Sequence, residues 1–413
     1  MIKLILGGFP CTEFSLAQKK NRINKVDFTA YEFVEFHNNN RLWYKHIDDF
    51  EKYIGDKLGV ENYKFAEGLQ LFFNCIAAID RTIEQYPNDK VYYMFENVSS
   101  MQKEIKETLT EILNRLYGGV STEINSALVS AQTRKRIYFT NYGEISQPED
   151  KGILLKDILE SGIVDKEKAY ALKHQAGNAR DYIKKHHTAV AFEPVNITEP
   201  IRLGDIDSNA QAHRVYSPYG KSVALRANAG GQGGKTGLYV TPVEIVITED
   251  TVVEELWGGN LKIDGKLIYK VENGLIPFKE DFYPINLPDG YYLIRKLTVK
   301  ESMRLQTIPE WYEFPVSDTQ AYKMLGNGWT RDVISHILSF IPNIQNEEID
   351  VLSLYDGMSC GKLALMDLGC EKNINTYRAY EIDPYAIKTT QHNFPDTIQC
   401  GDAFKVRDID WEA

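Results

Sequence analysis

Short apolar runs alternate with amphipathic stretches over the first part of the chain. Residues 2–6 and 91–95 are apolar runs that predict buried strands. Residues 68–86 carry Leu, Phe and Ile at helical spacing and predict an amphipathic helix, and a second helix is expected over 102–117. Alternation of buried strands with helices predicts an α/β fold.

The same alternation returns after a polar, acidic linker at 342–350. The elements there are a strand (351–355), a glycine turn (356–361), a helix (362–368), a strand (376–380) ending at Glu381, and a run (398–400) that leads to Asp402. This order is typical of a Rossmann-like dinucleotide or adenosyl site. The glycine turn lets a ligand approach a helix N-terminus, and the acid after the next strand binds ribose hydroxyls.

The middle of the chain has a different character. Gly, Asn and Ser increase from about residue 144, and the apolar patches at 238–247 and 261–271 read as strands, with a hairpin turn at Asp264-Gly265. The glycine-rich run 230–237 lacks the spacing of a phosphate loop and does not lie between a strand and a helix, so we reject a nucleoside triphosphate site. We predict a second, mostly β and loop domain over 144–310.

Charge and cysteine content narrow the class of protein. The net charge is −11, which argues only weakly against nucleic acid as a partner, because a local basic face decides such binding. The five cysteines form no CxxC pair and no Cys/His spacing for zinc, which favours free thiols in a reducing cytoplasm and no metal. No apolar run is long enough to span a bilayer, and no signal segment precedes the first strand.

A single cysteine follows the first strand. Gly7 and Gly8 permit a tight turn, and a proline fixes the backbone just before Cys11. Open α/β sheets place their chemistry at the carboxyl ends of strands, so Cys11 is a candidate nucleophile. On this stretch alone a buried structural thiol is an equal alternative, because free cysteine often serves as a small core residue.

Two further groups of charged residues accompany strands. Glu96 directly follows the run 91–95, where it is either an acid at a helix N-terminus or an active-site acid. Arg134 and Arg136 lie in a run of three cations that usually marks a solvated turn. Alternation with the apolar strand that follows would instead point both arginines to one side.

Together these motifs resemble those of the DNA cytosine-5 methyltransferase family. Residues 7–15 resemble its GGxPCQxFS loop, 96–98 its ENV motif, 132–136 its QxRxR motif, 295–309 its RxLTxRExxRLQxFP segment, 326–330 its last motif, and 353–361 with 381–383 its S-adenosylmethionine motifs. Phe9 and Thr12 depart from the family pattern beside the cysteine. Six separate matches make the likeness specific, although residues 18–66 and much of 145–290 are not covered.

The order of the motifs differs from that of most of the family. There the cofactor motifs come first, whereas here the cysteine loop comes first and the cofactor motifs follow residue 326. The resemblance therefore implies a circular permutation of a Rossmann-like α/β domain, which is tolerable because domain termini are often close together. We expect residues 1–143 to form the catalytic half, 144–310 a target-recognition domain, and 311–413 the remainder with the cofactor-binding half.

The resemblance implies roles for the four candidate residues. Cys11 would add to carbon 6 of a cytosine flipped out of its duplex, as chemistry on a base requires. Glu96 would hydrogen-bond the ring nitrogen and amino group of that base, while Arg134 and Arg136 would hold its carbonyl, the loop or a phosphate. Carbon 5 would then accept the methyl group, lose its proton and release Cys11.

The resemblance also implies the cofactor, S-adenosyl-L-methionine. Tyr355 and Ile382 would lie against the adenine, Glu381 would bind the ribose hydroxyls, and Asp402 would hold the adenine amino group. The other residues expected in the cofactor site are Asp356, Gly357, Gly361, Asn327 and Trp329. No metal is expected.

The expected partner is double-stranded DNA, because a recognition domain is needed to read base edges in a groove. A cognate restriction endonuclease acting on the same site is a further expectation, as is a cytoplasmic location without membrane attachment. Two alternatives stay open: a catalytically silent DNA-binding homologue, and an RNA cytosine-5 methyltransferase using the same chemistry.

Overall fold

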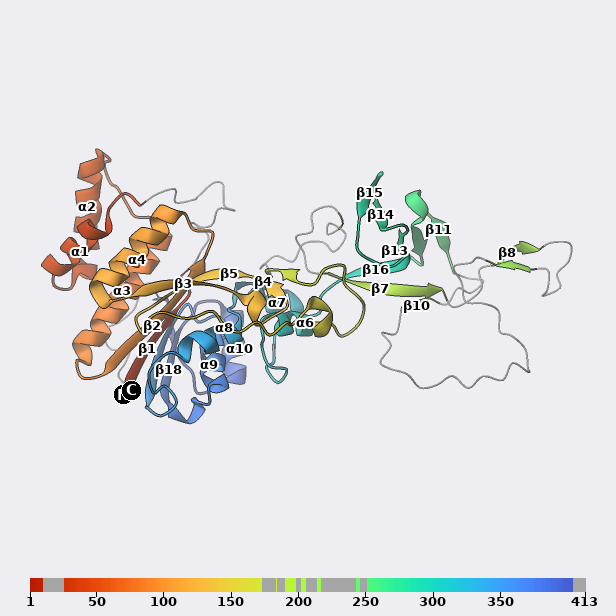
Figure 1. Cartoon of the computed structure of the whole chain (residues 1–413). Coiled ribbons are helices and arrows are strands. Elements are labelled where there is room, and N and C mark those ends of the chain that lie inside the picture. Colours follow the sequence, from red (N-terminus) through yellow and green to blue (C-terminus); the bar gives the residue numbers. More distant parts are fainter. Residues whose placement is uncertain are drawn as a thin grey trace. The chain divides into compact units, whose positions relative to one another are not determined.

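The computed structural model describes residues 1–9, 26–172, 183, 190–197, 202–205, 214–216, 243–245 and 251–403, and gives the backbone alone at 170, 196–197, 202–205, 214–216 and 243–245. The chain divides into two compact units, one made of Met1–Gly152 with Met303–Ala413 and the other of Ile153–Ser302 (Figure 1). The second unit lies within the predicted domain 144–310, whose recognition role stays a prediction. Cys11 and the glycine-rich run 230–237 lie outside the described residues.

A seven-stranded sheet forms the centre of the first unit, in the order β19-β18-β17-β1-β2-β5-β3. Its strands are β1 (Ile2–Gly7), β2 (Lys90–Val98), β3 (Val120–Asn125), β5 (Lys135–Thr140), β17 (Ile349–Leu354), β18 (Ile374–Tyr380) and β19 (Ile398–Gly401). β1 is parallel to both of its neighbours, β17 and β2, whereas β5 is antiparallel to β2 and β3. Beyond β1 the sheet continues with β2, β5 and β3, and beyond β17 it continues in the other direction with β18 and β19. The winding therefore reverses between β1 and β17, where open α/β sheets bind ligands.

Helices cover both faces of this sheet, which explains why β1 is apolar apart from Lys3. Ile2, Leu4 and Leu6 belong to one core cluster and Ile5 to another, because successive side chains of a strand point to opposite faces. The Ile5 cluster includes residues of α3 (Glu67–Gln85) and α4 (Lys103–Tyr117), and the other includes residues of α8 (Arg331–Leu338) and α9 (Cys360–Asp367). The two helices predicted over 68–86 and 102–117 are thus confirmed.

A buried ion pair joins β1 to β17. Lys3 pairs with Asp350 in the strand register, and its Nζ lies 2.6 Å from Asp350 Oδ2. Asn375 Nδ2 and Thr376 Oγ1 also donate to Asp350, at 3.0 and 2.7 Å. Lys3 Nζ additionally lies 3.8 Å from the centre of the Tyr86 ring. Because a one-residue slip would leave both charges buried without partners, this pair fixes the register of the two strands.

An aromatic-rich helical segment precedes α3, in a part of the chain to which the sequence assigned no task. It consists of α1 (Ala30–Asn39), η1 (Trp43–Lys45) and α2 (Ile47–Leu58). Asp80 of α3 accepts hydrogen bonds from Trp43 Nε1 at 2.7 Å and Tyr117 OH at 2.6 Å, and its Oδ2 lies 2.8 Å from His37 Nε2. One carboxylate therefore links α1, η1 and α4 to α3.

The second unit is built on a six-stranded sheet in the order β10-β7-β16-β13-β12-β11. Its strands are β7 (Val190–Ile197), β10 (Val243–Ile245), β11 (Val253–Glu255), β12 (Leu261–Ile263), β13 (Lys266–Val271) and β16 (Gly290–Lys296), accompanied by the pairs β8 (Arg202–Asp205) with β9 (Arg214–Tyr216) and β14 (Leu275–Phe278) with β15 (Asp281–Pro284). The hairpin predicted at Asp264-Gly265 is confirmed, and both residues have positive φ, 46° and 79°. The prediction of a mostly β domain holds for the described residues of this unit.

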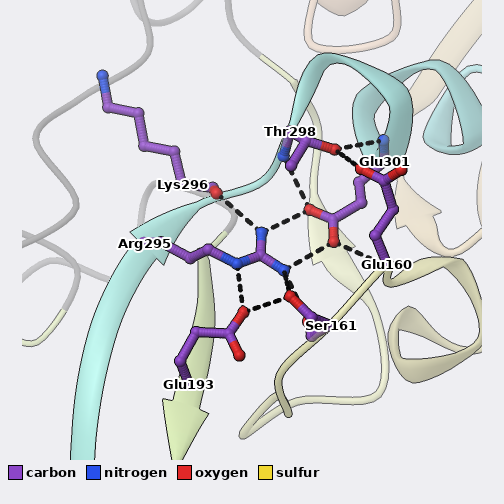
Figure 2. Close-up of polar contacts among 7 residues, drawn as sticks. All are labelled: Glu160, Ser161, Glu193, Arg295, Lys296, Thr298 and Glu301. Atoms are coloured by element: carbon purple, nitrogen blue, oxygen red, sulfur yellow. Dashed lines mark hydrogen bonds and ion pairs between the residues drawn. The ribbon is translucent and has the colours of Figure 1, made fainter. Parts of the chain in front are cut away.

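Arg295 is the centre of a polar cluster in the second unit, drawn in Figure 2. Its guanidinium donates to Glu193 Oε1 at 2.6 Å, to both oxygens of Glu301 at 2.7 and 2.8 Å, and to the Ser161 carbonyl at 2.6 Å. Glu301 also forms a capping box with Thr298, because each backbone N–H donates to the other side chain. Arg295 thus joins β16, β7, the segment at Ser161 and the start of α6.

The remaining elements are short. They are β4 (Gln132–Thr133), β6 (Ala169–Tyr170), α6 (Val299–Leu305), α7 (Asp318–Asn327), α10 (Pro384–Asn393) and the single turns η2 (Ser126–Leu128), η3 (Leu155–Ile158), η6 (Trp257–Gly259) and η7 (Glu371–Asn373). Within the described part of the chain, no helix has the length and apolar character needed to cross a bilayer.

Candidate active site

The carboxyl ends of β1 and β17 are neighbours, since Gly7 pairs with Leu354. Gly8 and Phe9 continue from β1, and the cofactor turn, residues 355–361, continues from β17. Phe9 is buried, with its ring centre 5.7 Å from that of Phe72. Cys11 itself lies outside the described residues, so its role as nucleophile stays a prediction.

Asn97 holds the chain just before that cysteine. Its Nδ2 donates to the carbonyl oxygen of Phe9 at 3.1 Å, and its Oδ1 accepts from the Val98 N–H at 2.8 Å. The side chain is fully buried, where an unmet amide would be costly. Sequence reasoning noted the motif that contains Asn97 but gave this residue no role.

Glu96 and Arg136 form an ion pair at the end of β2, with Arg136 Nε 2.7 Å from Glu96 Oε1. Arg136 lies opposite Val98 in the antiparallel register, and Val98 shares a face of β2 with Glu96, so the two charges meet diagonally. The prediction that the strand ends before Glu96 is wrong, because Asn97 and Val98 continue the pairing with β5. The side chains are 18% and 12% exposed, so the pair is fixed but still reaches solvent.

Arg134 has different partners from Arg136. It is buried, and its guanidinium donates to the carbonyl oxygens of Gly326 at 3.2 Å and Gly328 at 2.9 Å. Buried carbonyls at a helix end need such donors, and α7 ends at Asn327. Arg134 therefore holds the backbone on both sides of Asn327.

Gln306 completes the support of the same segment. Its Nε2 donates to the carbonyl of Leu325 at 2.5 Å, and its Oε1 accepts from Gln132 Nε2 at 2.9 Å and from Thr330 Oγ1 at 2.8 Å. It is buried, so this network makes segment 326–330 rigid. Gln306 was not identified as a site residue from the sequence, because nothing local relates it to residues 326–330.

The cofactor turn has a constrained backbone. Tyr355, Gly357 and Ser359 have φ values of 61°, 61° and 57°, in the left-handed region that non-glycine residues rarely adopt. The buried carboxylate of Asp356 holds the turn, because it accepts from the Ser359 hydroxyl and from Tyr377 OH, the latter at 2.8 Å. Burial raises the pKa of Asp356 to about 6, and the Glu381 charge acts in the same direction.

Glu381 lies at the carboxyl end of β18 and reaches the cofactor turn. Its Oε2 accepts from the Gly357 N–H at 2.8 Å, and its Oε1 accepts from the N–H groups of Ile382 and Asp383, both at 2.8 Å. Ile382 is 71% exposed, an unusual degree for an isoleucine beside a ligand-type turn. An acid and an uncovered apolar side chain therefore lie together at this edge.

The other predicted cofactor residues lie around the same edge of the first unit. Asn327 is exposed at the end of α7, and Asp402 directly follows β19. Burial raises the pKa of Tyr355, and the charge of Asp402 acts in the same direction, so these two residues are near each other. Gly361 is closely packed, because a Cβ there would meet Leu6 Cδ1 at 2.5 Å.

The residues at this edge fit an adenosyl ligand. A Cβ at Gly357 would meet nothing within 4 Å, so open space adjoins the turn. The neighbouring carboxylate of Glu381 suits vicinal hydroxyls, and the exposed side chain of Ile382 suits a flat apolar ring. Among the described residues, no three His, Cys, Asp or Glu side chains gather in a way that could hold a metal ion.

A mostly parallel sheet whose winding reverses beside a glycine turn and a strand-end acid defines an α/β protein with a nucleotide-type ligand site. A model of the C-5 cytosine-specific DNA methylase family matches residues 54–343, well over half of the chain. The chain therefore belongs to the C-5 cytosine-specific DNA methylase family, whose members use S-adenosylmethionine.

Individual relatives are distant. Type II methyltransferase M.HhaI of Haemophilus parahaemolyticus is 23% identical over 281 residues, covering 65% of this chain and 66% of that enzyme, just under two thirds of its length. Among solved structures, Dnmt2 methyltransferase of S. pombe matches with 13% identity and a TM-score of 0.31 over 66% of this chain and 73% of its own. The Entamoeba histolytica methyltransferase EhMeth matches with 12% identity and a TM-score of 0.30 over 82% and 97%.

Proposed function

We propose that this chain transfers a methyl group from S-adenosylmethionine to carbon 5 of a cytosine flipped out of a specific DNA duplex, through a covalent bond from Cys11. The observation that carries the proposal is the carboxyl end of β2. There Asn97 binds the carbonyl of Phe9, two residues before Cys11, and the adjacent Glu96 is paired with Arg136. Nucleophile and acid are thereby expected at one edge of the sheet.

The reaction follows from those residues. The Cys11 thiolate adds to carbon 6 of the cytosine, while Glu96 hydrogen-bonds the ring nitrogen and amino group and so stabilises the charge that develops on the ring. Carbon 5 becomes nucleophilic and takes the methyl group supplied by the bound cofactor, whose product is S-adenosylhomocysteine. The carbon 5 proton then leaves as a proton, and the electron pair of that bond expels Cys11.

Arg136 and Arg134 have separate tasks in this proposal. Arg136 orients the Glu96 carboxylate from 2.7 Å and remains near enough to solvent to meet the base carbonyl or a phosphate. Arg134 is committed to the carbonyls of Gly326 and Gly328, so it acts through the backbone around Asn327. In this proposal Arg136 therefore contacts the substrate, whereas Arg134 supports the backbone of the site.

The cofactor is assigned to the edge between the cofactor turn and β18. Glu381 would bind the ribose hydroxyls, Ile382 and Tyr355 would contact the adenine, and Asp402 its amino group. Gly357 and Gly361 would allow close backbone approach, and Asn327 and Trp329 would complete the site. Asp356 would support the turn rather than contact the ligand, since its carboxylate accepts hydrogen bonds from Ser359 and Tyr377.

The second unit is assigned to recognition of duplex DNA, with residues 1–143 and 311–413 forming one catalytic domain. We also propose that the chain is a circular permutation of the usual family order. The parallel pairing of β1 with β17 supports this, because strands from the first and last parts of the chain are neighbours in one sheet. A cytoplasmic location and a cognate restriction endonuclease remain predictions.

Covalent capture tests the proposal. The protein is incubated with S-adenosylmethionine and duplex DNA of diverse sequence carrying 5-fluorocytosine, which blocks loss of the carbon 5 substituent, and is run on a denaturing gel. We expect a cross-linked species that Cys11→Ala abolishes and Cys400→Ala, which removes a partly exposed thiol, preserves. Absence of a cross-link, or its survival in Cys11→Ala, would refute the assignment. A cross-link only to matched RNA would move the substrate to RNA, and cofactor-independent DNA binding alone would indicate a silent homologue.

A further inference from the structure

Trp329 lies at the point where the winding of the sheet reverses. It follows the segment that Arg134 and Gln306 hold, and it is partly buried against the core cluster that contains Leu6. Gly8 leaves β1 on one side of this point, and Gly361 belongs to the first turn of α9 on the other. The indole of Trp329 therefore lies between two glycines.

The indole contacts both glycines, from different edges of the ring. A Cβ at Gly8 would lie 3.0 Å from Trp329 Nε1 and 3.3 Å from Cζ2, and a Cβ at Gly361 would lie 3.7 Å from Trp329 Cζ3. The first two distances are tighter than most real Cβ contacts, so a side chain at Gly8 would require the indole to shift by a few tenths of an ångström, whereas the last distance is ordinary van der Waals contact. The ring therefore fills the space between the chain leaving β1 and the start of α9.

The backbone of Trp329 is fixed on both sides. The preceding carbonyl, of Gly328, accepts from Arg134 at 2.9 Å, and the carbonyl of Trp329 itself lies 3.6 Å from the Sγ of Cys360. The side chain of Thr330 lies 2.9 Å from the Ser126 hydroxyl. A ring held in this way cannot withdraw when either neighbour moves, because close-packed contacts transmit displacement.

We propose that Trp329 is a positioning residue that makes the path of the chain at Gly8 depend on the cofactor turn. The proposal rests on the function proposed above, in which the chain beyond Gly8 carries the nucleophile. The indole sets the distance between Gly8 and α9, so a change in the turn before α9 reaches Gly8 through the ring. Trp329 thereby has a second role beside the one predicted for it at the cofactor.

A double-mutant cycle tests this role with the full-length protein. The variants are Trp329→Leu, which removes the ring, Gly8→Ala, which adds a methyl group that crowds the ring, and the double variant. The rate of methyl transfer is measured in single turnover at saturating S-adenosylmethionine, and the affinity for S-adenosylhomocysteine is measured by calorimetry.

We expect Trp329→Leu to slow methyl transfer about 10- to 100-fold, because small misplacements of reacting groups have effects of that size. Its affinity for S-adenosylhomocysteine should fall by a smaller factor than the rate, because Trp329 is only one of several residues expected at the cofactor. Gly8→Ala should be slower still, and the double variant should be faster than Gly8→Ala, because the added methyl group then occupies the vacated space. Trp43→Phe is the control, since it disturbs a buried tryptophan bonded to Asp80 and should leave the single-turnover rate within about twofold.

The outcomes separate this inference from the proposed function. Equal rates in Trp329→Leu and the wild type, or losses that multiply in the double variant, would overturn the role of Trp329. If the wild type methylates no nucleic acid, the proposed function fails. The same double-mutant cycle is then measured as free energies of unfolding in urea. Additive unfolding free energies would then overturn the contact itself.

Discussion

Replacement of Lys3 by Met tests what holds β1 against β17. The side chains of Lys3 and Asp350 are 4% and 7% exposed, so the variant leaves a carboxylate buried without its cation. Removing one member of a buried ion pair costs about 3–5 kcal/mol. Asn375 and Thr376 still donate to Asp350 in the variant, so we expect a loss near the lower limit, about 3 kcal/mol.

The measurement is the free energy of unfolding of the first unit in urea at pH 7. Lys90→Met is the matched control, because Lys90 at the start of β2 also pairs with a carboxylate from the last part of the chain, Glu347 just before β17, but it is 49% exposed. An exposed pair contributes about 0–1 kcal/mol. The double variant Lys3→Met with Asp350→Leu should recover most of the loss, because an apolar pair of similar volume needs no solvation.

The pH dependence gives an independent check. The pKa of Asp350 is lowered, because hydrogen bonds and charge from Lys3, with bonds from Thr376 and Asn375, outweigh the opposing effect of burial. Its stabilising contribution is therefore present above its unfolded pKa and is lost as pH falls through the lower folded value. Without Lys3, burial raises that pKa, so the deficit of Lys3→Met should grow as pH rises from about 4 to 7. A loss equal to that of Lys90→Met, or one independent of pH, would refute the reasoning.

Three further predictions concern single side chains. Asp356→Asn should remove a pH dependence, because the wild-type carboxyl, with its pKa raised to about 6, favours folding when protonated. Relative to the variant, the wild type should lose about 2 kcal/mol of unfolding free energy between pH 4 and 7, and parallel curves would contradict this. Arg295→Lys should destabilise the second unit by about 3 kcal/mol in urea, because Glu193 and Glu301 lose a bidentate partner, while Arg41→Lys, at an 87% exposed ion pair, should have no measurable effect. Glu381→Ala should weaken S-adenosylhomocysteine binding in calorimetry and leave duplex DNA binding intact; equal losses would count against the site.

The strands and helices that bury one periodic face could be predicted from the sequence. The run 2–6 became β1, the helix expected over 68–86 became α3, and the turn at Asp264-Gly265 was placed correctly. In each case the signal is local, since apolar spacing or turn chemistry within about ten residues determines the element. The end of β2 was misjudged because pairing with β5, and not local polarity, extends the strand to Val98.

The supports of the site could not be predicted in the same way. The bonds from Arg134 to Gly326 and Gly328, and from Asn97 to Phe9, join residues that are far apart in the sequence. No periodicity links a donor to a distant carbonyl, so motifs identified the residues without their partners. The elements α1 and η1 before α3 were not predicted for a related reason, because their aromatic residues pack on α3 and follow no single spacing.

The position of β1 in the chain has a consequence for synthesis. The buried ion pair of Lys3 cannot form until Asp350 has been synthesised, 347 residues later. At translation rates of about 5–20 residues per second, the ribosome needs roughly 17–70 s to supply it. During that interval an apolar strand that ends up at the middle of the sheet lacks one of its two neighbours, so this protein is expected to depend on chaperones while it is being made.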